Sequence, residues 1–182
     1  KNMLLLKNDT IALRPLEPED LDILYIWEND PDTWQVSNTL VPFSRFVLKQ
    51  YLETAHLDIF ETKQMRLVIE LIDPVAPAAI GLIDLFDFDP YHQRAGVGLL
   101  IAQEEQRFKG YGRQALDLLI AYCFNHLDLH QLFCNITTDN EGSIRMFKKA
   151  GFKVAGTKEQ WIKKEGQYWD ELLLQKINPN HK

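Results

Sequence analysis

A short cationic stretch in the second half of the chain carries the strongest chemical signal. It reads Arg107-Phe108-Lys109-Gly110-Tyr111-Gly112-Arg113 and lies between a β-rich segment and a segment whose apolar residues recur with helical period. Its two glycines leave backbone N–H groups uncovered where the helix begins, and a helix N-terminus with bare amides binds anions. Three cationic side chains strengthen this expectation, because the protein as a whole has a formal net charge of −6. The stretch predicts a pyrophosphate site; the alternative is a tight turn whose glycines relieve strain and whose charges are solvated.

A second stretch with informative spacing runs from Asn140 to Phe152. Asn140 is a favoured N-cap residue for a helix, and Gly151 suits the position just after its last turn. Ser143 lies one turn inside this helix. On these residues alone, an ordinary capped helix with a solvated cationic face explains the pattern equally well.

Taken together and in this order, the two stretches resemble the GNAT superfamily of N-acetyltransferases. The family motifs are Q/R-x-x-G-x-G/A at the start of one helix and N-x-x-S-x-x-x-Y-x-x-x-G-F around the next. The matching residues are Arg107, Gly110 and Gly112 in the first motif and Asn140, Ser143, Gly151 and Phe152 in the second. The pattern extends over almost the whole chain and is closest to the spermidine and ribosomal-protein branches. The resemblance implies an enzyme that uses acetyl-CoA as cosubstrate; the alternative is a non-catalytic module that binds or senses acyl-CoA.

The resemblance also implies how the coenzyme is held. In the family, the first motif cradles the coenzyme A pyrophosphate, the preceding strand pairs with the pantetheine arm, and two strands splay apart to leave a slot for the thioester. Carried over to this chain, the coenzyme-binding residues are Leu99, Leu100, Ile101, Arg107, Phe108, Lys109, Gly110, Tyr111, Gly112, Arg113, Asn140, Ser143, Phe147 and Lys149.

The implied reaction is direct attack of a primary amine on the thioester in a ternary complex, with a polyamine-like small amine or a protein N-terminus as acceptor. An amine with a pKa of about 10 is mostly protonated at neutral pH, so a carboxylate must take its proton directly or through a water. Asp84 and Asp87 are the candidates, because they end a predicted strand that should border the acceptor slot; strand-end carboxylates in solvent are the alternative. Spermidine acetyltransferases carry acids at both positions. The acidic stretch after their first helix is replaced here by residues 39–43, which carry no charge.

Phe147 is a departure from the family pattern. In many relatives a tyrosine at this place protonates the leaving thiolate, and phenylalanine has no proton to donate. A thiol with a pKa of about 8.5 is a tolerable leaving group even without protonation. Ser143 or a water is the replacement donor, as a serine is thought to be in the ribosomal-protein branch. The catalytic candidates are therefore Asp84, Asp87 and Ser143.

The elements that must position these residues follow from periodicity and turn residues. Strands are predicted over residues 10–14, 66–72, 79–88, 95–102, 131–137, 152–162 and 168–177. Helices are predicted over residues 18–30 and 44–60, from 112 to 127 and from 140 to 150, with a loop over 31–43. The order βααβββαβαββ predicts an α+β class with a mixed sheet that carries helices on both sides. The resemblance implies that this is a GNAT-like acyl-CoA N-acyltransferase fold, with a central mixed, mostly antiparallel seven-stranded sheet flanked by four helices.

Composition narrows the functional classes further. With 182 residues, 46% hydrophobic and 25% charged, the chain is expected to form a single domain over residues 1–182, with its core at about 10–177. The negative net charge disfavours nucleic acid and anionic membrane surfaces as partners. No apolar run approaches the roughly 20 residues that span a bilayer, and the apolar stretch within the opening residues 1–7 is too short for a signal peptide, so a cytoplasmic location is expected.

The two cysteines, Cys123 and Cys134, lie in apolar periodic runs without metal-ligand spacing. We expect both to be core thiols, and we expect no metal. The resemblance allows a homodimer or a larger homo-oligomer.

Overall fold

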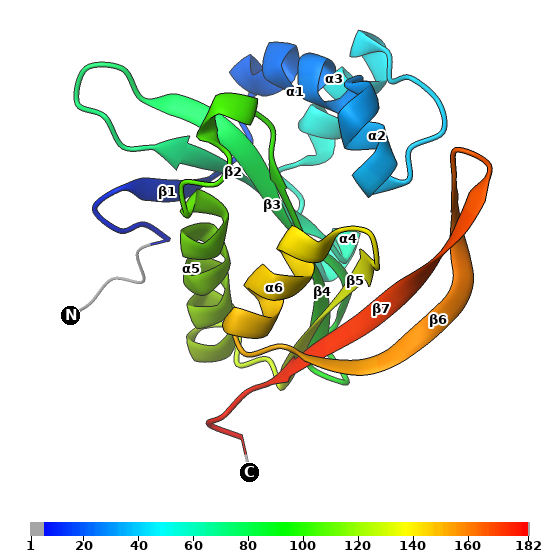
Figure 1. Ribbon diagram of the computed structural model, residues 1–182. Coiled ribbons are helices and arrows are strands. Elements are labelled where there is room, and N and C mark those ends of the chain that lie inside the picture. Colours follow the sequence, from blue (N-terminus) through cyan, green and yellow to red (C-terminus); the bar gives the residue numbers. More distant parts are fainter. Residues whose placement is uncertain (1–5, 182) are drawn as a thin grey trace.

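Seven strands form one continuous sheet in the computed structural model of the protein, which describes residues 6–181 (Figure 1). Their spatial order is β1-β2-β3-β4-β5-β7-β6, and every neighbouring pair is antiparallel except β4 and β5. The strands are β1 (Ile11–Pro15), β2 (Met65–Leu71), β3 (Ala78–Asp89), β4 (Arg94–Ile101), β5 (Gln131–Thr137), β6 (Lys153–Lys164) and β7 (Gln167–Ile177). The predicted fold class is confirmed. Most of the opening segment 1–7 lies outside the described residues.

The described residues contain six α-helices, two more than the sequence predicted. They are α1 (Leu21–Glu28), α2 (Pro31–Ser37), α3 (Arg45–Thr54), α4 (Ile59–Thr62), α5 (Tyr111–Asn125) and α6 (Glu141–Lys149), with 3-10 turns at Pro18–Asp20 and Glu104–Gln106. The loop expected over 31–43 was wrong in its first half, because Asp30 caps α2 and Pro31 opens it. The helix expected to reach residue 60 ends at Thr54, since Asp58 accepts from the amides of Phe60 and Glu61 and starts a separate turn, α4.

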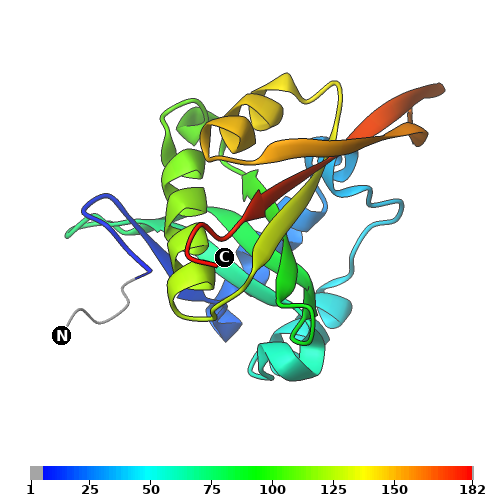
Figure 2. The same ribbon diagram turned by 90° about the horizontal axis from the view of Figure 1, so that it is seen from below.

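Helices cover both faces of the sheet, as alternate residues of β2 show. Leu67 and Ile69 point into the main core, which also contains the apolar stripe of α5, whereas Val68 between them packs with Leu24 of α1 and Leu48 of α3. Figures 1 and 2 show α5 running along the sheet, and α1 to α3 as a separate group of helices that lies apart from α5. The long hairpin of β6 and β7 forms one end of the sheet and curves away from the other strands.

The two cysteines are core thiols, as predicted. Cys123 on α5 and Cys134 on β5 are free and buried. Burial raises the pKa of each thiol to about 12, which keeps both sulfurs neutral and unreactive at physiological pH.

The parallel pair β4 and β5 opens into a fork. The two strands pair only from Arg94 to Gly96 against Gln131 to Phe133, although β4 continues to Ile101 and β5 to Thr137. Phe86 of β3 lies across Gly96 and meets Phe133 edge to face with ring centroids 5.6 Å apart, and a Cβ on Gly96 would lie 2.4 Å from the Phe86 ring. The slot that the family resemblance implied is therefore present where pairing stops.

Within residues 6–181, no helix is long and apolar enough to span a membrane.

Candidate active site

A groove with a volume of about 750 Å³ lies at the N-terminus of α5; we call it the α5 groove. Its walls come from the end of β4, the segment that joins β4 to α5, and one face of α6. The lining residues are Asp32, Thr33, Val36, Leu99, Leu100, Ile101, Gln106, Arg107, Phe108, Gly110, Tyr111, Gly112, Arg113, Asn140, Gly142, Ser143, Arg145, Met146 and Lys149.

The backbone before α5 is folded so that its amides face this groove. Phe108 and Gly110 both have left-handed backbone angles, with φ of 61° and 84°, which turn the chain sharply into the helix. In α5 the amide of Gln114 donates to the carbonyl of Gly110, whereas the amides of residues 111–113 precede the first carbonyl that a helix supplies. Arg107 fixes the start of the turn, because its Nε donates to the carbonyl of Ile101 at 2.9 Å. The result is a cluster of N–H groups suited to an anion.

The charge in the α5 groove has the sign that an anion requires. Four cationic side chains line it, namely Arg107, Arg113, Arg145 and Lys149. Among the described lining residues, Asp32 is the one carboxylate. Arg113 also pairs with Asp117 and Arg145 with Glu141, so the four cations and three carboxylates leave a net charge of +1 at the groove. This sign favours phosphate groups in a protein whose net charge is −6.

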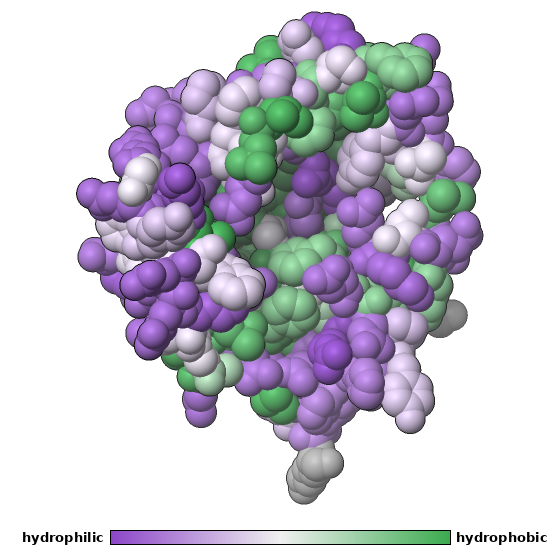
Figure 3. Space-filling model, turned by 90° about the vertical axis from the view of Figure 1, so that its right-hand side faces the viewer, coloured by the Kyte–Doolittle hydropathy of each residue, from purple (hydrophilic) through white to green (hydrophobic). Residues whose placement is uncertain are grey.

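A second hollow, with a volume of about 560 Å³, occupies the fork between β4 and β5; we call it the fork cavity. It reaches from α1 and α2 across the fork to the hairpin of β6 and β7, and Figure 3 shows the molecule hollowed on this side. Residues that line both spaces are Thr33, Val36, Leu99, Leu100, Asn140 and Ser143. A ligand in the α5 groove can thus reach a second ligand in the fork cavity.

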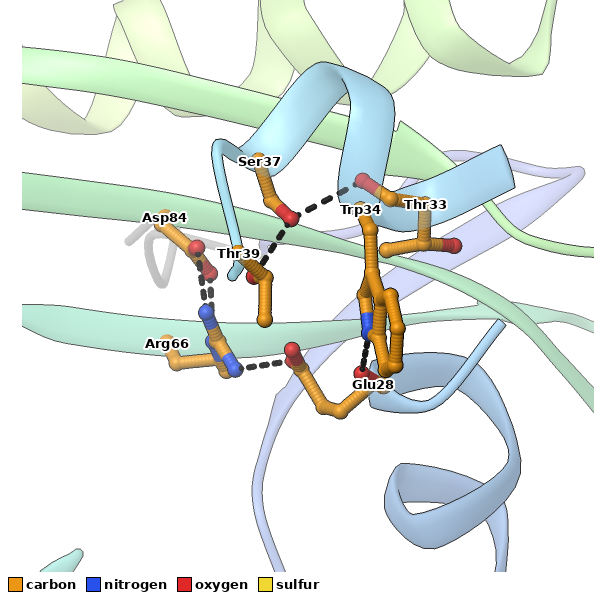
Figure 4. A network of polar contacts seen from close by, with 7 residues as sticks. All are labelled: Glu28, Thr33, Trp34, Ser37, Thr39, Arg66 and Asp84. Carbon is orange, nitrogen blue, oxygen red and sulfur yellow. Dashed lines mark hydrogen bonds and ion pairs between the residues drawn. The ribbon is translucent and has the colours of Figure 1, made fainter. Parts of the chain in front are cut away.

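A network of charged groups forms one wall of the fork cavity (Figure 4). Arg66 of β2 donates to both carboxylate oxygens of Asp84, at 2.9 Å each, and to Oε1 of Glu28 at 2.7 Å. Burial lowers the pKa of Arg66, but the charges and hydrogen bonds of its partners outweigh that cost and the net shift is upward. Arg66 is therefore a permanent cation between two carboxylates.

The model of the acetyltransferase (GNAT) domain matches residues 10–153 of the chain. The chain belongs to the GNAT family of N-acetyltransferases. It is 30% identical over 165 residues to spermidine N(1)-acetyltransferase of Escherichia coli (strain K12), covering 91% of this chain and 84% of that protein. It is 27% identical over 191 residues to a probable N-acetyltransferase of Bacillus subtilis (strain 168), covering 97% and 98%.

The fold of this GNAT protein also matches solved structures. Spermidine N-acetyltransferase from Vibrio cholerae, in complex with CoA and spermine, superposes with a TM-score of 0.84 over 94% of this chain and 97% of that chain. The two sequences are 22% identical over the match, so this comparison establishes the fold.

Twelve of the fourteen residues named as coenzyme contacts line the α5 groove of this GNAT protein. The exceptions are Lys109, whose Nζ bonds Gln106, and Phe147, which lines the fork cavity instead. The prediction omitted Arg145 and Met146, although Met146 lies three residues after Ser143 and Arg145 lies four residues before Lys149, the spacings of neighbours on a helix. Thr33 and Val36 were missed because α2 was expected to be a loop.

The three catalytic candidates of the sequence occupy different surroundings. Asp84 lines the fork cavity with both oxygens bonded to Arg66. Asp87 does not line it: it is exposed, has a φ of 47°, and lies at the irregularity between Phe86 and Asp89 where β3 leaves its register. Ser143 lies where the two spaces meet.

Sequence reasoning missed Glu28 altogether. It is the last residue of α1, and its carboxylate lines the fork cavity with 12% of the side chain exposed. The indole of Trp34 donates to the carbonyl of Glu28 at 2.6 Å and ties α2 to the end of α1. Its partner Arg66 lies on β2, 38 residues away in sequence, so only the folded structure reveals the contact.

Phe147 has become part of the cavity wall. Its side chain is 3% exposed and meets Phe152 edge to face with centroids 5.1 Å apart. Asn140, one turn before Ser143, accepts from the Ser143 amide at 3.3 Å and so holds the start of α6 against the fork.

Filling the α5 groove at its glycine turn is expected to abolish coenzyme binding. In Gly110→Trp the indole would stand beside the amides of residues 111–113, and we expect coenzyme A affinity, measured by calorimetry, to fall at least 100-fold. Gly166→Trp is the matched control, because Gly166 also has a positive φ, 79°, with open space around its Cβ position. An unchanged affinity in Gly110→Trp would remove the phosphates from this turn.

Proposed function

We propose that this GNAT protein transfers an acetyl group from acetyl-CoA to a primary amine by direct attack in a ternary complex. The observation that carries the proposal is the junction of the α5 groove and the fork cavity at Leu99, Leu100 and Ser143. The groove suits the phosphates and pantetheine arm of the coenzyme, and the fork cavity suits the amine. The Vibrio cholerae structure in complex with CoA and spermine supports a protein of this fold that binds both a coenzyme and an amine.

The residues of β4 hold the thioester arm in this proposal. Beyond Gly96 the edge of β4 that faces β5 has lost its strand partner. Its N–H and C=O groups therefore need other partners, and the amide groups of a pantetheine arm supply them. This places the thioester in the fork, beside Ser143.

The transfer proceeds with a balanced exchange of bonds and protons. The neutral amine nitrogen attacks the thioester carbonyl, the C–N bond forms, and the C–S bond breaks with its electron pair on sulfur. One proton leaves the ammonium before attack, and a second leaves the nitrogen as the amide forms. Ser143 or a water returns one proton to the thiolate.

The acceptor is a small amine, polyamines included, or a protein N-terminus. The curated relatives named for spermidine support an amine. The uncharged residues 39–43 and the internal pairing of the cavity carboxylates favour an acceptor with few positive charges.

We also propose that the chain forms one acetyltransferase domain and self-associates. A dodecameric structure of spermidine N-acetyltransferase from Vibrio cholerae supports self-association. Size-exclusion chromatography with light scattering measures the oligomer directly.

Free thiol release is expected when the protein meets acetyl-CoA and an amine. The panel contains spermidine, butylamine, 1,4-diaminobutane and a peptide with a free N-terminus, and mass spectrometry should show one acetyl group per thiol released. Stabilisation by coenzyme A, about 2.7 kcal/mol at 100 times the Kd, without thiol release from any acceptor would instead establish an acyl-CoA-binding module. Phe147 is the observation that favours this second function.

Ser143→Ala is expected to lower kcat about tenfold with little change in the KM for the amine, because a proton donor to the thiolate is lost while a tolerable leaving group remains. Phe147→Tyr in the Ser143→Ala background should recover most of that loss, since it adds a hydroxyl to the cavity wall. Full activity of Ser143→Ala would exclude the serine as donor.

A further inference from the structure

Three carboxylates line the fork cavity among residues 6–181, and their partners distinguish them. Glu171 of β7 forms a neutral pair with Lys158, whose Nζ lies 2.7 Å from Oε1 of Glu171. Glu28 and Asp84 share one cation, Arg66. Two carboxylates and one guanidinium leave a net charge of −1 on this wall, which matches one ammonium group.

Within this triad the oxygens are used unequally. Both oxygens of Asp84 accept from Arg66, at 2.9 Å each. Glu28 accepts from Arg66 through Oε1 alone, and its Oε2 has no donor among the described residues. Glu28 is therefore the member of the triad with a carboxylate oxygen open to a ligand.

The contacts of Glu28 hold its carboxylate through Oε1 and its backbone through the carbonyl. The groups that face it from neighbouring elements are Arg66 on β2, Asp84 behind Arg66 on β3, and Tyr51 on α3, whose ring centroid lies 5.7 Å from the guanidinium carbon. The backbone of Glu28 is held by Trp34, as Figure 4 shows. A carboxylate that is 12% exposed binds a cation more strongly than one in bulk water.

We propose that Glu28 receives the acceptor amine in the fork cavity: Oε2 binds the ammonium group and takes its proton before attack on the thioester. This inference rests on the proposed function. The proton passes from nitrogen to Oε2 and then to solvent water, and the neutral amine remains to form the C–N bond. Asp84 is a positioning residue, because it holds Arg66 against Glu28.

The test is Glu28→Gln, which keeps the side-chain shape and the bond to Arg66 but removes the charge. With butylamine and acetyl-CoA we expect kcat/KM to fall about 100-fold at pH 7. The deficit should shrink below tenfold as the pH approaches 10, because the amine is then neutral without a base. The affinity for coenzyme A should not change.

Two matched variants give the comparison. Asp84→Asn should lose less activity than Glu28→Gln, with a deficit that stays constant with pH. Glu53→Gln, an exposed charge change on α3, should match the parent protein. A Glu28→Gln deficit below threefold at pH 7, a deficit that does not shrink with pH, or a larger and pH-dependent loss in Asp84→Asn would overturn the assignment.

Calorimetry of butylamine with the coenzyme A complex separates this inference from the proposed function. If no amine releases thiol, the proposed function fails, and the role of Glu28 is decided by binding alone. A loss of at least tenfold in butylamine affinity on Glu28→Gln supports the ammonium site. Equal affinity, or no binding by the parent protein, overturns it.

Discussion

The interruption of pairing between β4 and β5 is the constraint on which the rest of the site depends. Two parallel neighbours that pair over three residues and then diverge leave backbone groups without partners along β4. Phe86, packed over Gly96 and against Phe133, fills the fork where the divergence starts. The α5 groove and the fork cavity lie beyond it and meet there, so a molecule bound through its phosphates at α5 can present its other end to the opposite side.

The α5 groove and the fork cavity carry charges of opposite sign. The α5 groove has a net charge of +1, while the protein as a whole is acidic. The fork cavity holds a small negative balance around Arg66. Under the proposed function, these charges favour an anionic coenzyme in the α5 groove and a cationic acceptor in the fork cavity.

The sequence predicted the residues of the α5 groove better than those of the fork cavity, for a physical reason. The groove at the start of α5 depends on local backbone features, and Gly110, Gly112 and Arg107 are close neighbours in the chain. The acceptor side depends on contacts between distant segments. Asp84 was predicted as a candidate base at the end of a strand, but antiparallel register places it beside Arg66, and α1 adds Glu28 from further away.

Local errors in the predicted elements had consequences at the site. Asp30 and Pro31 were interpreted as the end of one helix, although the same pair begins α2, and two of its residues, Thr33 and Val36, line both spaces. Asp87 was placed beside the acceptor slot because it lies near the end of its strand, whereas the structure has it exposed, at the irregularity after Phe86. The seven strands and the buried cysteines were predicted correctly because they depend on long apolar runs in the sequence, and the fork was implied by the resemblance to the family.

A crystal structure of the protein with coenzyme A tests the account most directly. The account predicts the pyrophosphate within hydrogen-bonding distance of the amides of residues 111–113 and the thiol between β4 and β5 beyond Gly96, beside Ser143. Phosphates bound elsewhere, or strands that pair along their whole length with no room for the thiol, would contradict it.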